Sequence, residues 1–407
     1  MELKNVVTQN AQLKNQNSPV RRIMLIAGEA SGDTLGAELV KALQQRIASR
    51  DTPGRLEFFG AGGPRMESVG VKLAFDLTRH AVVGIWEVLK NYSKFKSFFD
   101  QLLAAALEGK PHVIILIDYP GFNLRFAKAI KERFREQGSD GWSAKIVYYV
   151  SPQIWAWHES RVHQIARDVD LLLSIFPFEK DWFAKRRPDL RVEFVGHPLF
   201  DRYPDFSPHP ALLAPRRDPL ILLLPGSRIR EIKKHLPVMA EAAKQIAAEI
   251  PTARFRMVLP AQPLVGIAEP LIAGLPRLEV ATAGLAAALA EAQLAIASSG
   301  TVTVECAFFR VPTVVLYKTS WSTYELGRRF INVKYIAMPN LLADELIYPE
   351  FIQNAATSAN LCREALDLLR NQARIDSMRL QLTRVIDSLG GPGASDRSAT
   401  AVLSVMS

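Results

Sequence analysis

The chain has 407 residues, of which 48% are hydrophobic and 22% are charged, and its formal net charge is +9. This composition is ordinary for a soluble globular protein, and the basic balance favours acidic partners: nucleic acid, anionic lipid or phosphorylated substrates. Cys306 and Cys362 lie in no paired motif, so no disulfide framework and no cysteine metal site are predicted. Residues 1–20 lack the apolar core of a signal peptide, and the apolar runs are far shorter than the ~20 residues that span a bilayer. We therefore expect a disordered leader over 1–20 and a cytoplasmic chain without a membrane span.

Short apolar strands then alternate with helices, which is typical of a parallel sheet covered on both faces. A helix over 35–46 follows the first strand, and the strands expected in the first half are 22–27, 56–59, 113–117, 146–150, 171–174 and 192–195. A proline-rich, charged segment over 196–219 interrupts this pattern and is interpreted as a hinge. The alternation restarts with strands at 220–224, 255–258, 278–280, 294–297 and 313–317, and helices are expected from 348 onward.

The pattern predicts an α/β chain with two Rossmann-like doubly wound domains that face a cleft. We expect an N-terminal domain over 21–198, a C-terminal domain over 199–365, and C-terminal helices over 366–407 that pack back on the N-terminal domain or on a partner chain. In open α/β sheets, ligands bind beyond the carboxyl ends of the strands. The motifs of this chain follow expected strands and therefore lie at those ends.

In the first domain, a glycine-containing loop follows the first strand and carries Gly28, Ser31, Gly32 and Asp33. Its backbone N–H groups could cradle an anion at the start of the next helix, or its Ser and Asp could simply cap that helix. Asp118 ends the apolar run 112–117 and precedes a Pro-Gly turn. It could take a proton from an attacking hydroxyl, or it could be a turn residue.

In the second domain, Gly226, Ser227 and Arg228 follow the strand 220–224. A guanidinium there suits a diphosphate, because its fork pairs two oxygens at once. Arg230, Lys233 and Lys234 we interpret as a solvated basic face. Ser299, Gly300 and Thr301 follow the strand 294–297, and Glu305 lies one helical turn beyond Thr301. A phosphate ligand followed one turn later by a carboxylate for ribose hydroxyls predicts a nucleotide site.

Three further patterns are ambiguous. Trp155, Trp157 and His158 in one loop could line a sugar or acyl site, or anchor the core at a domain edge. Asp168-Val169-Asp170 matches a metal–nucleotide motif, but it falls at a helix-to-strand junction where Asp is common, so we predict no metal. An apolar, aromatic stripe with interspersed lysines suits either the core or a helix in the bilayer interface; it comprises Ile85, Trp86, Val88, Leu89, Tyr92, Phe95, Phe98 and Phe99.

Ten ordered blocks give the chain a close resemblance, over about residues 22–390, to the lipid-A-disaccharide synthase family. The blocks are AGEASGD (27–33), FFGAGGPRM (58–66), GIWEVL (84–89), IDYPGFN (117–123), YVSPQIWAWH (149–158), FPFEK (176–180), VGHP (195–198), LLPGSR (223–228), SSGTVTVE (298–305) and MPNLLA (338–343). The resemblance implies a glycosyltransferase-B fold and an inverting transferase that needs no metal or other cofactor.

The same resemblance implies the substrates and the roles of residues. The donor would be UDP-2,3-diacylglucosamine, the acceptor 2,3-diacylglucosamine 1-phosphate (lipid X), and the products a β-1,6-linked disaccharide 1-phosphate and UDP. Asp118 would be the general base, Arg228 would neutralise the leaving UDP, Glu305 would hold its ribose, and Asn340 would line the donor site. Members are peripheral membrane proteins, which favours the docking interpretation of the stripe at the inner membrane; no nucleic-acid partner is expected, and a homodimer is left open.

One position departs from the family pattern: many members carry Asp where this chain has Gly121. Asp118 is retained, so the assignment of the base stands, while a supporting second carboxylate is placed in doubt. Two rival functions share the architecture. A UDP-sugar epimerase would need no acyl or membrane site, and a non-catalytic nucleotide-sugar-binding protein would not need Asp118, Arg228 and Glu305 together.

Overall fold

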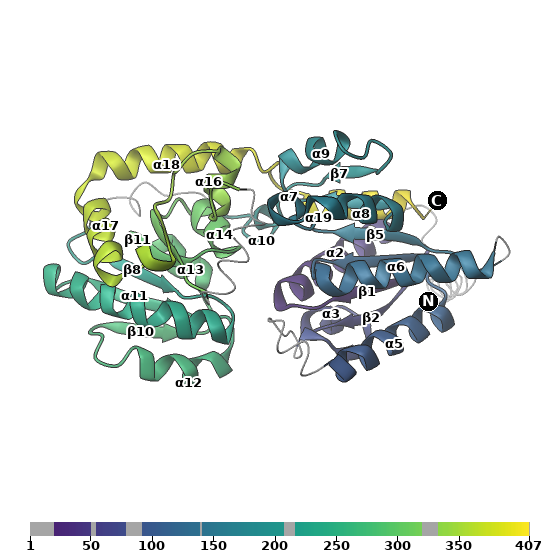
Figure 1. The fold of residues 1–407 in the computed structure, drawn as a ribbon, viewed down its shortest axis with the longest axis horizontal. Helices are drawn as coiled ribbons and strands as arrows, with labels where there is room; N and C mark the ends of the chain where they lie inside the picture. The colour runs from purple at the N-terminus through teal and green to yellow at the C-terminus, as the bar shows by residue number, and fades with distance from the viewer. Residues whose placement is uncertain are drawn as a thin grey trace, which may run out of the picture. The chain divides into compact units, whose positions relative to one another are not determined.

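The computed structural model describes residues 20–49, 54–78, 92–138, 141–206, 216–319 and 333–406. The chain divides into two compact units (Figure 1): unit 1 runs to Pro204 and resumes at Leu389, and unit 2 comprises Asp205–Ser388. Within the described ranges, every helix is too short or too polar to cross a membrane. The chain therefore leaves unit 1 once and returns to it near its end.

Unit 1 is built on a seven-stranded parallel sheet with the order β3-β2-β1-β4-β5-β6-β7. The central strands are buried on both faces, as all five residues of β4 show, which accounts for their continuous apolar sequences. The strands are β1 (Val20–Ala27), β2 (Arg55–Gly62), β3 (Lys72–Asp76), β4 (Val113–Ile117), β5 (Lys145–Tyr149), β6 (Leu171–Ser174) and β7 (Val192–Phe194).

The helices of unit 1 cover the two faces of this sheet. Right-handed crossovers and the reversal of strand order after β3 place α2 on one face and α5, α6 and α8 on the other. The helices are α2 (Ala30–Ala48), α3 (Pro64–Ser68), α5 (Tyr92–Gly109), α6 (Pro120–Gln137), α7 (Ile154–Trp157), α8 (Val162–Asp168), α9 (Pro177–Ala184), α10 (Leu199–Arg202) and α19 (Ala394–Ser404). The first of these begins at Ala30, five residues earlier than expected, so most of the Gly28–Asp33 loop is the first turn of a helix.

Unit 2 has a six-stranded parallel sheet with the order β10-β9-β8-β11-β12-β13. Its strands are β8 (Leu220–Leu224), β9 (Arg254–Val258), β10 (Leu278–Ala281), β11 (Leu294–Ser298), β12 (Thr313–Tyr317) and β13 (Glu350–Ile352). Its helices are α11 (Ile229–Glu249), α12 (Val265–Ala268), α13 (Leu285–Glu291), α14 (Val302–Phe308), α16 (Met338–Ala343), α17 (Ser358–Arg370) and α18 (Gln372–Asp387). The region from 348 onward was expected to be helical, but it first adds the edge strand β13.

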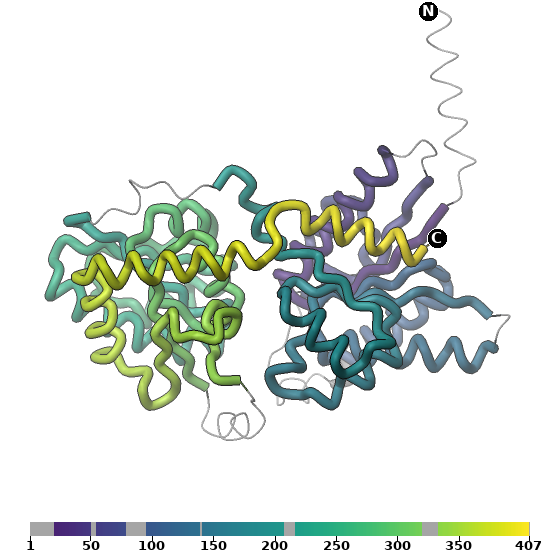
Figure 2. The backbone as a smooth tube through the Cα atoms, turned by 90° about the horizontal axis from the view of Figure 1, so that it is seen from above, coloured from purple at the N-terminus to yellow at the C-terminus, as the bar shows by residue number. Residues whose placement is uncertain are grey.

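The C-terminal segment is shared between the two units. Helices α17 and α18 belong to unit 2, whereas α19 returns to unit 1 and packs along α2 (Figure 2). The carboxylate of Asp201 accepts hydrogen bonds from the N–H groups of Gly393 (2.5 Å) and Ser395 (2.7 Å), and Arg397 Nε donates to Val195 O (2.7 Å). The expected segment 366–407 is therefore not one structural piece, and residues 196–204 of the expected hinge are packed within unit 1.

Candidate active site

The candidate residues of unit 1 lie where its strand order reverses. Strands β1 and β4 are neighbours in the sheet, and their last residues, Ala27 and Ile117, lie opposite each other. Gly28 and Asp118 therefore leave the sheet side by side. The pairing of β1 with β4 thus brings together two motifs that are 90 residues apart in the sequence. Ligands of doubly wound folds bind at this type of switch point.

Gly28 lies directly against the ring of Tyr119. A Cβ atom at Gly28 would come within 2.2 Å of Tyr119 Cδ1, so a larger residue does not fit without moving the ring. Asp118 and Tyr119 both adopt positive φ angles, 48° and 50°, in the left-handed region that non-glycine residues rarely occupy. Such strained backbone is held by its surroundings and concentrates at functional sites.

Three hydrogen bonds fix the backbone of Asp118. Its N–H donates to Tyr149 O (2.9 Å), and its carbonyl oxygen accepts from Asn123 Nδ2 (2.8 Å) and from the hydroxyl of Tyr148 (2.6 Å). Burial raises the pKa of Tyr148 well above its usual value, so this phenol remains a proton donor. The side chain of Asp118, the predicted general base, is thus attached to a turn that three hydrogen bonds hold in place. Asn123 and Tyr148 hold this turn, and sequence analysis gave neither of them a role.

The first turn of α2 distributes its residues between solvent and core. Ser31 is exposed, whereas Gly32 is buried, and a Cβ atom added to it would lie 3.4 Å from Ala27 Cβ and 3.6 Å from Ile117 Cγ2. Asp33 is buried, and its carboxylate accepts three backbone N–H groups, from Gly63 (2.9 Å), Arg65 (3.0 Å) and Met66 (2.9 Å). The expected ligand role of Asp33 is thus replaced by a structural one, because its oxygens hold the start of α3.

Gly121, at the start of α6, is exposed, and a Cβ atom added there would meet nothing within 4 Å. An aspartate at this position would therefore fit the fold without rearrangement.

Unit 2 repeats the arrangement of unit 1. Its strand order reverses between β8 and β11, where Leu224 lies opposite Ala297. The loops that follow these strands carry the residues predicted to bind a nucleotide: Gly226, Ser227 and Arg228 after β8, and Ser299, Gly300 and Thr301 after β11. The predicted nucleotide-binding loops are thus neighbours at the switch point of the second sheet.

The loop after β8 is organised by Glu231, which sequence analysis did not single out. Glu231 Oε2 accepts the N–H groups of Ser227 (2.9 Å) and Arg228 (3.3 Å), and Oε1 lies 3.2 Å from Arg228 Nη1. The carboxylate sits so close to Gly226 (φ 117°) that a Cβ there would come within 2.3 Å of it. The backbone N–H groups of Ser227 and Arg228 are therefore already bound by a protein carboxylate, which also holds the guanidinium of Arg228, the predicted diphosphate ligand.

The loop after β11 has one anchored hydroxyl and one open side. Ser299 Oγ donates to Ile336 O (2.7 Å), while Gly300 has open space at its Cβ position and Thr301 is exposed. Glu305 is half-buried on α14, one turn after Thr301. Gly300 and Thr301, the predicted phosphate ligands, thus lie on the open side of this loop, and Glu305 lies one turn farther on.

Asn340 is completely buried, and its side-chain amide is used inside unit 2. Nδ2 donates to Tyr348 O (2.8 Å) and to Glu350 Oε1 (2.8 Å), and Oδ1 accepts the N–H groups of Ile347 (3.0 Å) and Tyr348 (2.8 Å). Four internal hydrogen bonds fill the capacity of the amide. The expected contact of its side chain with the donor is replaced by a structural role, in which Asn340 holds the segment 347–350 against α16.

His235 is a further buried residue at this edge of unit 2. Its Nδ1 lies 2.9 Å from Pro225 O, and its Nε2 accepts the N–H of Lys318 (3.0 Å). His235 thus ties the loop after β8 to the end of β12, and no sequence motif marked it.

Helix α5 carries the described part of the predicted docking stripe. Phe98 stacks on Phe75 (4.5 Å between ring centroids), and Phe99 packs edge-on against Phe122 (5.5 Å), so both rings face the core. Phe95 contacts Phe98 edge-on (6.4 Å) and is half-buried. The core interpretation therefore holds for Phe98 and Phe99. Ile85, Trp86, Val88 and Leu89 lie outside the described residues, as does the side chain of Tyr92.

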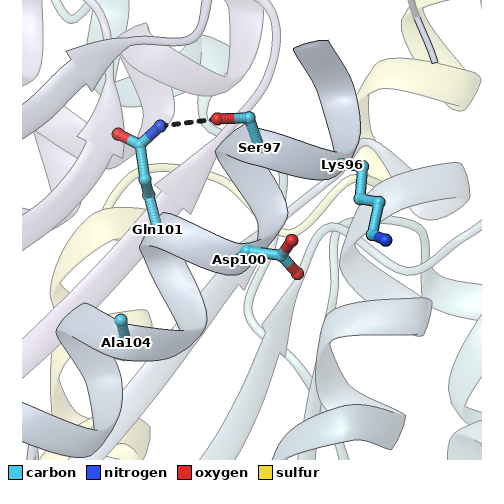
Figure 3. Close-up of a pocket in the computed structure, with 5 residues that line it drawn as sticks. All are labelled: Lys96, Ser97, Asp100, Gln101 and Ala104. Atoms are coloured by element: carbon cyan, nitrogen blue, oxygen red, sulfur yellow. Dashed lines mark hydrogen bonds between the residues drawn. The ribbon is translucent and has the colours of Figure 1, made fainter. Parts of the chain in front are cut away.

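The outer side of α5 is polar. Figure 3 shows an open pocket lined by Lys96, Ser97, Asp100, Gln101 and Ala104, all from this helix, with Gln101 Nε2 donating to Ser97 Oγ (3.0 Å). This described face of α5 therefore presents charged and amide groups to solvent.

The Asp168–Asp170 pair is engaged in structural contacts. Asp168 is buried and binds the guanidinium of Arg167 (2.7 Å), and Asp170 Oδ2 accepts from Lys131 Nζ (2.8 Å) and from the N–H of Ile146 (2.7 Å). Across the described ranges, no three His, Cys, Asp or Glu side chains come together in a way that would hold a metal ion.

Comparison with known proteins assigns the chain to a family. The family model of lipid-A-disaccharide synthetase matches residues 23–405. The chain belongs to the lipid-A-disaccharide synthase family. Similar family members include the synthase of Geobacter metallireducens (38% identity over 402 residues, covering 96% of this chain and 98% of the relative) and that of Myxococcus xanthus (37%, 95% and 97%). Synthase 1 of Legionella pneumophila strain Lens is 35% identical, with 92% and 94% covered.

Solved structures confirm the predicted glycosyltransferase-B fold. MurG of Acinetobacter baumannii superposes with a TM-score of 0.54 at 15% identity, covering 95% of this chain and 100% of MurG. The UDP-GlcNAc 2-epimerase of Neisseria meningitidis gives 0.58 at 11% identity, with 95% and 99% covered. These likenesses concern the fold alone. The family match decides between transferase and epimerase: lipid-A-disaccharide synthases are glycosyltransferases of lipid A biosynthesis, and this chain is one of them.

Proposed function

We propose that the chain transfers the diacylglucosaminyl group of UDP-2,3-diacylglucosamine to the 6-hydroxyl of 2,3-diacylglucosamine 1-phosphate. The products are the β-1,6-linked disaccharide 1-phosphate and UDP. The family assignment supports disaccharide synthesis for lipid A, and the identity of the two substrates is the finer part of the proposal. The observation that carries it is the placement of Asp118 on a rigid turn at the switch point of unit 1.

The transfer is a single displacement with inversion. Asp118 takes the proton of the acceptor 6-hydroxyl, the oxygen attacks C1 of the donor sugar, and the bond from C1 to the diphosphate oxygen breaks. The new bond forms on the face opposite the leaving group, so the α link of the donor becomes a β link. A positioned general base of this kind contributes about 10²–10⁴-fold to the rate.

Unit 2 holds the donor nucleotide. The guanidinium of Arg228 neutralises the negative charge that develops on the departing UDP, and Gly300 and Thr301 offer the open loop where a phosphate fits. Glu305, one turn along α14, accepts hydrogen bonds from the ribose hydroxyls. No metal ion takes part in this scheme.

Both substrates carry acyl chains, so the enzyme must meet them at a membrane surface. We place it peripherally on the cytoplasmic side of the inner membrane, where a net charge of +9 favours anionic headgroups. Because Phe98 and Phe99 pack into the core, the docking function falls to the part of the stripe that precedes α5. A homodimer is compatible with this scheme, which does not require one.

The test is a transfer assay in mixed micelles with both acylated substrates and EDTA. We expect a tetraacyl disaccharide 1-phosphate whose new anomeric proton shows a β coupling in NMR, with one UDP released for each disaccharide. Release of UDP without disaccharide, or conversion of UDP-GlcNAc to its 2-epimer, would contradict the proposal. Loss of activity with EDTA that Mg²⁺ restores would overturn its metal-free part.

A further inference from the structure

The loop after β5 contains two tryptophans that the structure treats differently. Trp155 is partly buried: its Nε1 donates to Glu179 Oε1 (3.1 Å), and its ring packs edge-on against Phe178 (5.0 Å). Trp157, two residues later, is 41% exposed. Trp155 therefore anchors the loop, and Trp157 exposes a large aromatic surface to solvent on that anchored loop.

Arg161 lies over this exposed ring. Its Cζ is 5.4 Å from the centroid of Trp157, close enough for a cation–π interaction, and the ring of His158 is 4.8 Å away on the same tryptophan. Glu159, the nearest acidic residue in sequence, binds Arg186 instead (2.6 Å). In the described part of the chain, no carboxylate forms an ion pair with Arg161. The loop thus combines an aromatic face with a cation that forms no ion pair with any carboxylate of the described ranges.

This pair lies at the same edge of unit 1 as Asp118. Strand β5 is the neighbour of β4, and the hydroxyl of Tyr148 near the end of β5 donates to Asp118 O (2.6 Å). Burial raises the pKa of that hydroxyl most, the charge of Asp118 raises it further, and the charge of Arg161 lowers it. Gln164 Nε2, one turn beyond Arg161, donates to Leu124 O on the helix that Asp118 precedes (3.2 Å).

We propose that Arg161 and Trp157 form a subsite for the phosphate-bearing sugar of the acceptor. Arg161 binds the 1-phosphate, and the ring of Trp157 packs against the sugar. This inference rests on the proposed function, in which the acceptor monophosphate is a second anionic group besides the donor diphosphate. A guanidinium suits it because its planar fork can bind two phosphate oxygens, and the tryptophan behind it limits its hydration.

The test compares two acceptors, 2,3-diacylglucosamine with and without its 1-phosphate, in the wild type and in Arg161→Gln. We expect the wild type to prefer the phosphorylated acceptor in kcat/KM, and Arg161→Gln to reduce that preference about 10- to 100-fold, the scale of a lost charge-assisted hydrogen bond. Activity toward the phosphate-free acceptor should change less than threefold. Arg161→Lys keeps the positive charge but lacks the planar fork of the guanidinium. Its preference for the phosphorylated acceptor should lie between that of the wild type and that of Arg161→Gln.

Two controls make the outcome specific. Arg135→Gln removes an exposed arginine from the other end of α6, which leads away from Asp118, and should leave the preference intact. Trp157→Ala should raise KM for both acceptors alike, because it removes a contact with the sugar and not with the phosphate. An unchanged preference in Arg161→Gln, or an equal loss with both acceptors, would overturn the inference. A wild-type protein that forms no disaccharide would instead refute the proposed function, and this inference with it.

Discussion

The carboxylate of Glu231 binds the guanidinium of Arg228 at 3.2 Å and, through its other oxygen, the backbone N–H of Ser227 at 2.9 Å. One side chain thereby caps α11, fixes the loop after β8 and aligns the predicted diphosphate ligand. Ion pairs as exposed as this one contribute little stability in water. We therefore expect the pair to orient the guanidinium of Arg228 rather than to stabilise the fold.

The first prediction concerns this pair. Glu231→Gln keeps an oxygen for the Ser227 N–H but loses the ionic contact with Arg228, so we expect the KM for the UDP-sugar donor to rise about 5- to 20-fold, equivalent to about 1–2 kcal/mol. The KM for the acceptor should be unaffected. Steady-state kinetics with each substrate varied in turn measures both, and Glu241→Gln, an exposed change on the same helix, is the matched control. A lower KM for the donor in Glu231→Gln would contradict this prediction and would show that the Glu231 carboxylate competes with the donor phosphate for Arg228.

The contact between Gly28 and Tyr119 yields a second prediction. Gly28→Ala places a methyl group into the tyrosine ring, and overpacking of this kind costs about 1–3 kcal/mol. We expect lower stability in urea unfolding together with reduced transfer, because Tyr119 follows Asp118. When Gly28→Ala is combined with Tyr119→Ala, the ring is absent, so the alanine should no longer lower the free energy of unfolding. Gly121→Ala, which meets no atom within 4 Å, is the control and should cost nothing. Equal effects of the two glycine substitutions would contradict the packing argument.

Asn340 should matter for folding rather than for contact with the donor. Asn340→Ala leaves the buried N–H groups of Ile347 and Tyr348 without their acceptor, and each unsatisfied group costs about 1–3 kcal/mol. We expect the urea midpoint of unit 2 to fall while UDP still binds the folded protein with nearly wild-type affinity, as calorimetry can measure at low temperature. A wild-type midpoint combined with lost UDP binding would restore Asn340 as a direct ligand.

Glu179 yields a prediction about pH. Complete burial raises the pKa of this carboxyl to about 8, against 4.5 for an ordinary glutamate, although the N–H groups of Trp155 and Phe176 bind it. Between these two pH values the unfolded chain releases a proton that the folded chain retains. Rising pH therefore favours the unfolded state, and the free energy of unfolding should fall from pH 4.5 to pH 8.

Glu179→Gln removes the ionisable group, so its unfolding free energy should depend less on pH over this window. Urea titrations at pH 5.5 and pH 8.5, followed by tryptophan fluorescence, give the slope of unfolding free energy against pH for the wild type and for Glu179→Gln. Glu108→Gln, an exposed change on α5, should keep the wild-type slope. If Glu179→Gln retains the full pH dependence, the buried carboxyl is not its source.

The sequence was sufficient for the fold because the buried central strands are continuous apolar runs. β4, β6, β8 and β12 begin and end where their residues indicate. Two edge strands were missed. In β3, Lys72 and Asp76 flank only three apolar residues, and β13 has just three residues, beginning with Glu350. Such short edge segments carry little periodic signal, and their pairing depends on the neighbouring strand.

The site was only partly predictable for a different reason. Gly28, Asp118 and the two loops of unit 2 follow strand ends, which the sequence reveals. It does not reveal which polar side chains the protein uses internally. Asp33 and Asn340 resemble ligands in the sequence. The carboxylate of Asp33 instead binds backbone groups about 30 residues away, and the amide of Asn340 binds backbone groups about 8 residues away and the side chain of Glu350. Glu231 and His235 lie on one helix and look like solvated polar residues until the loop and strand that they hold are known.

The most direct test of the central claim is the rate of disaccharide formation by Asp118→Asn in mixed micelles with saturating donor and acceptor. Asparagine tolerates the positive φ of this turn and keeps the shape of the side chain, but it cannot accept the proton. We predict that the wild type forms disaccharide and that kcat in the variant falls about 10²–10⁴-fold, with UDP affinity and urea midpoint unchanged. A variant that retains more than a tenth of the wild-type kcat would contradict the assignment of Asp118 as the base.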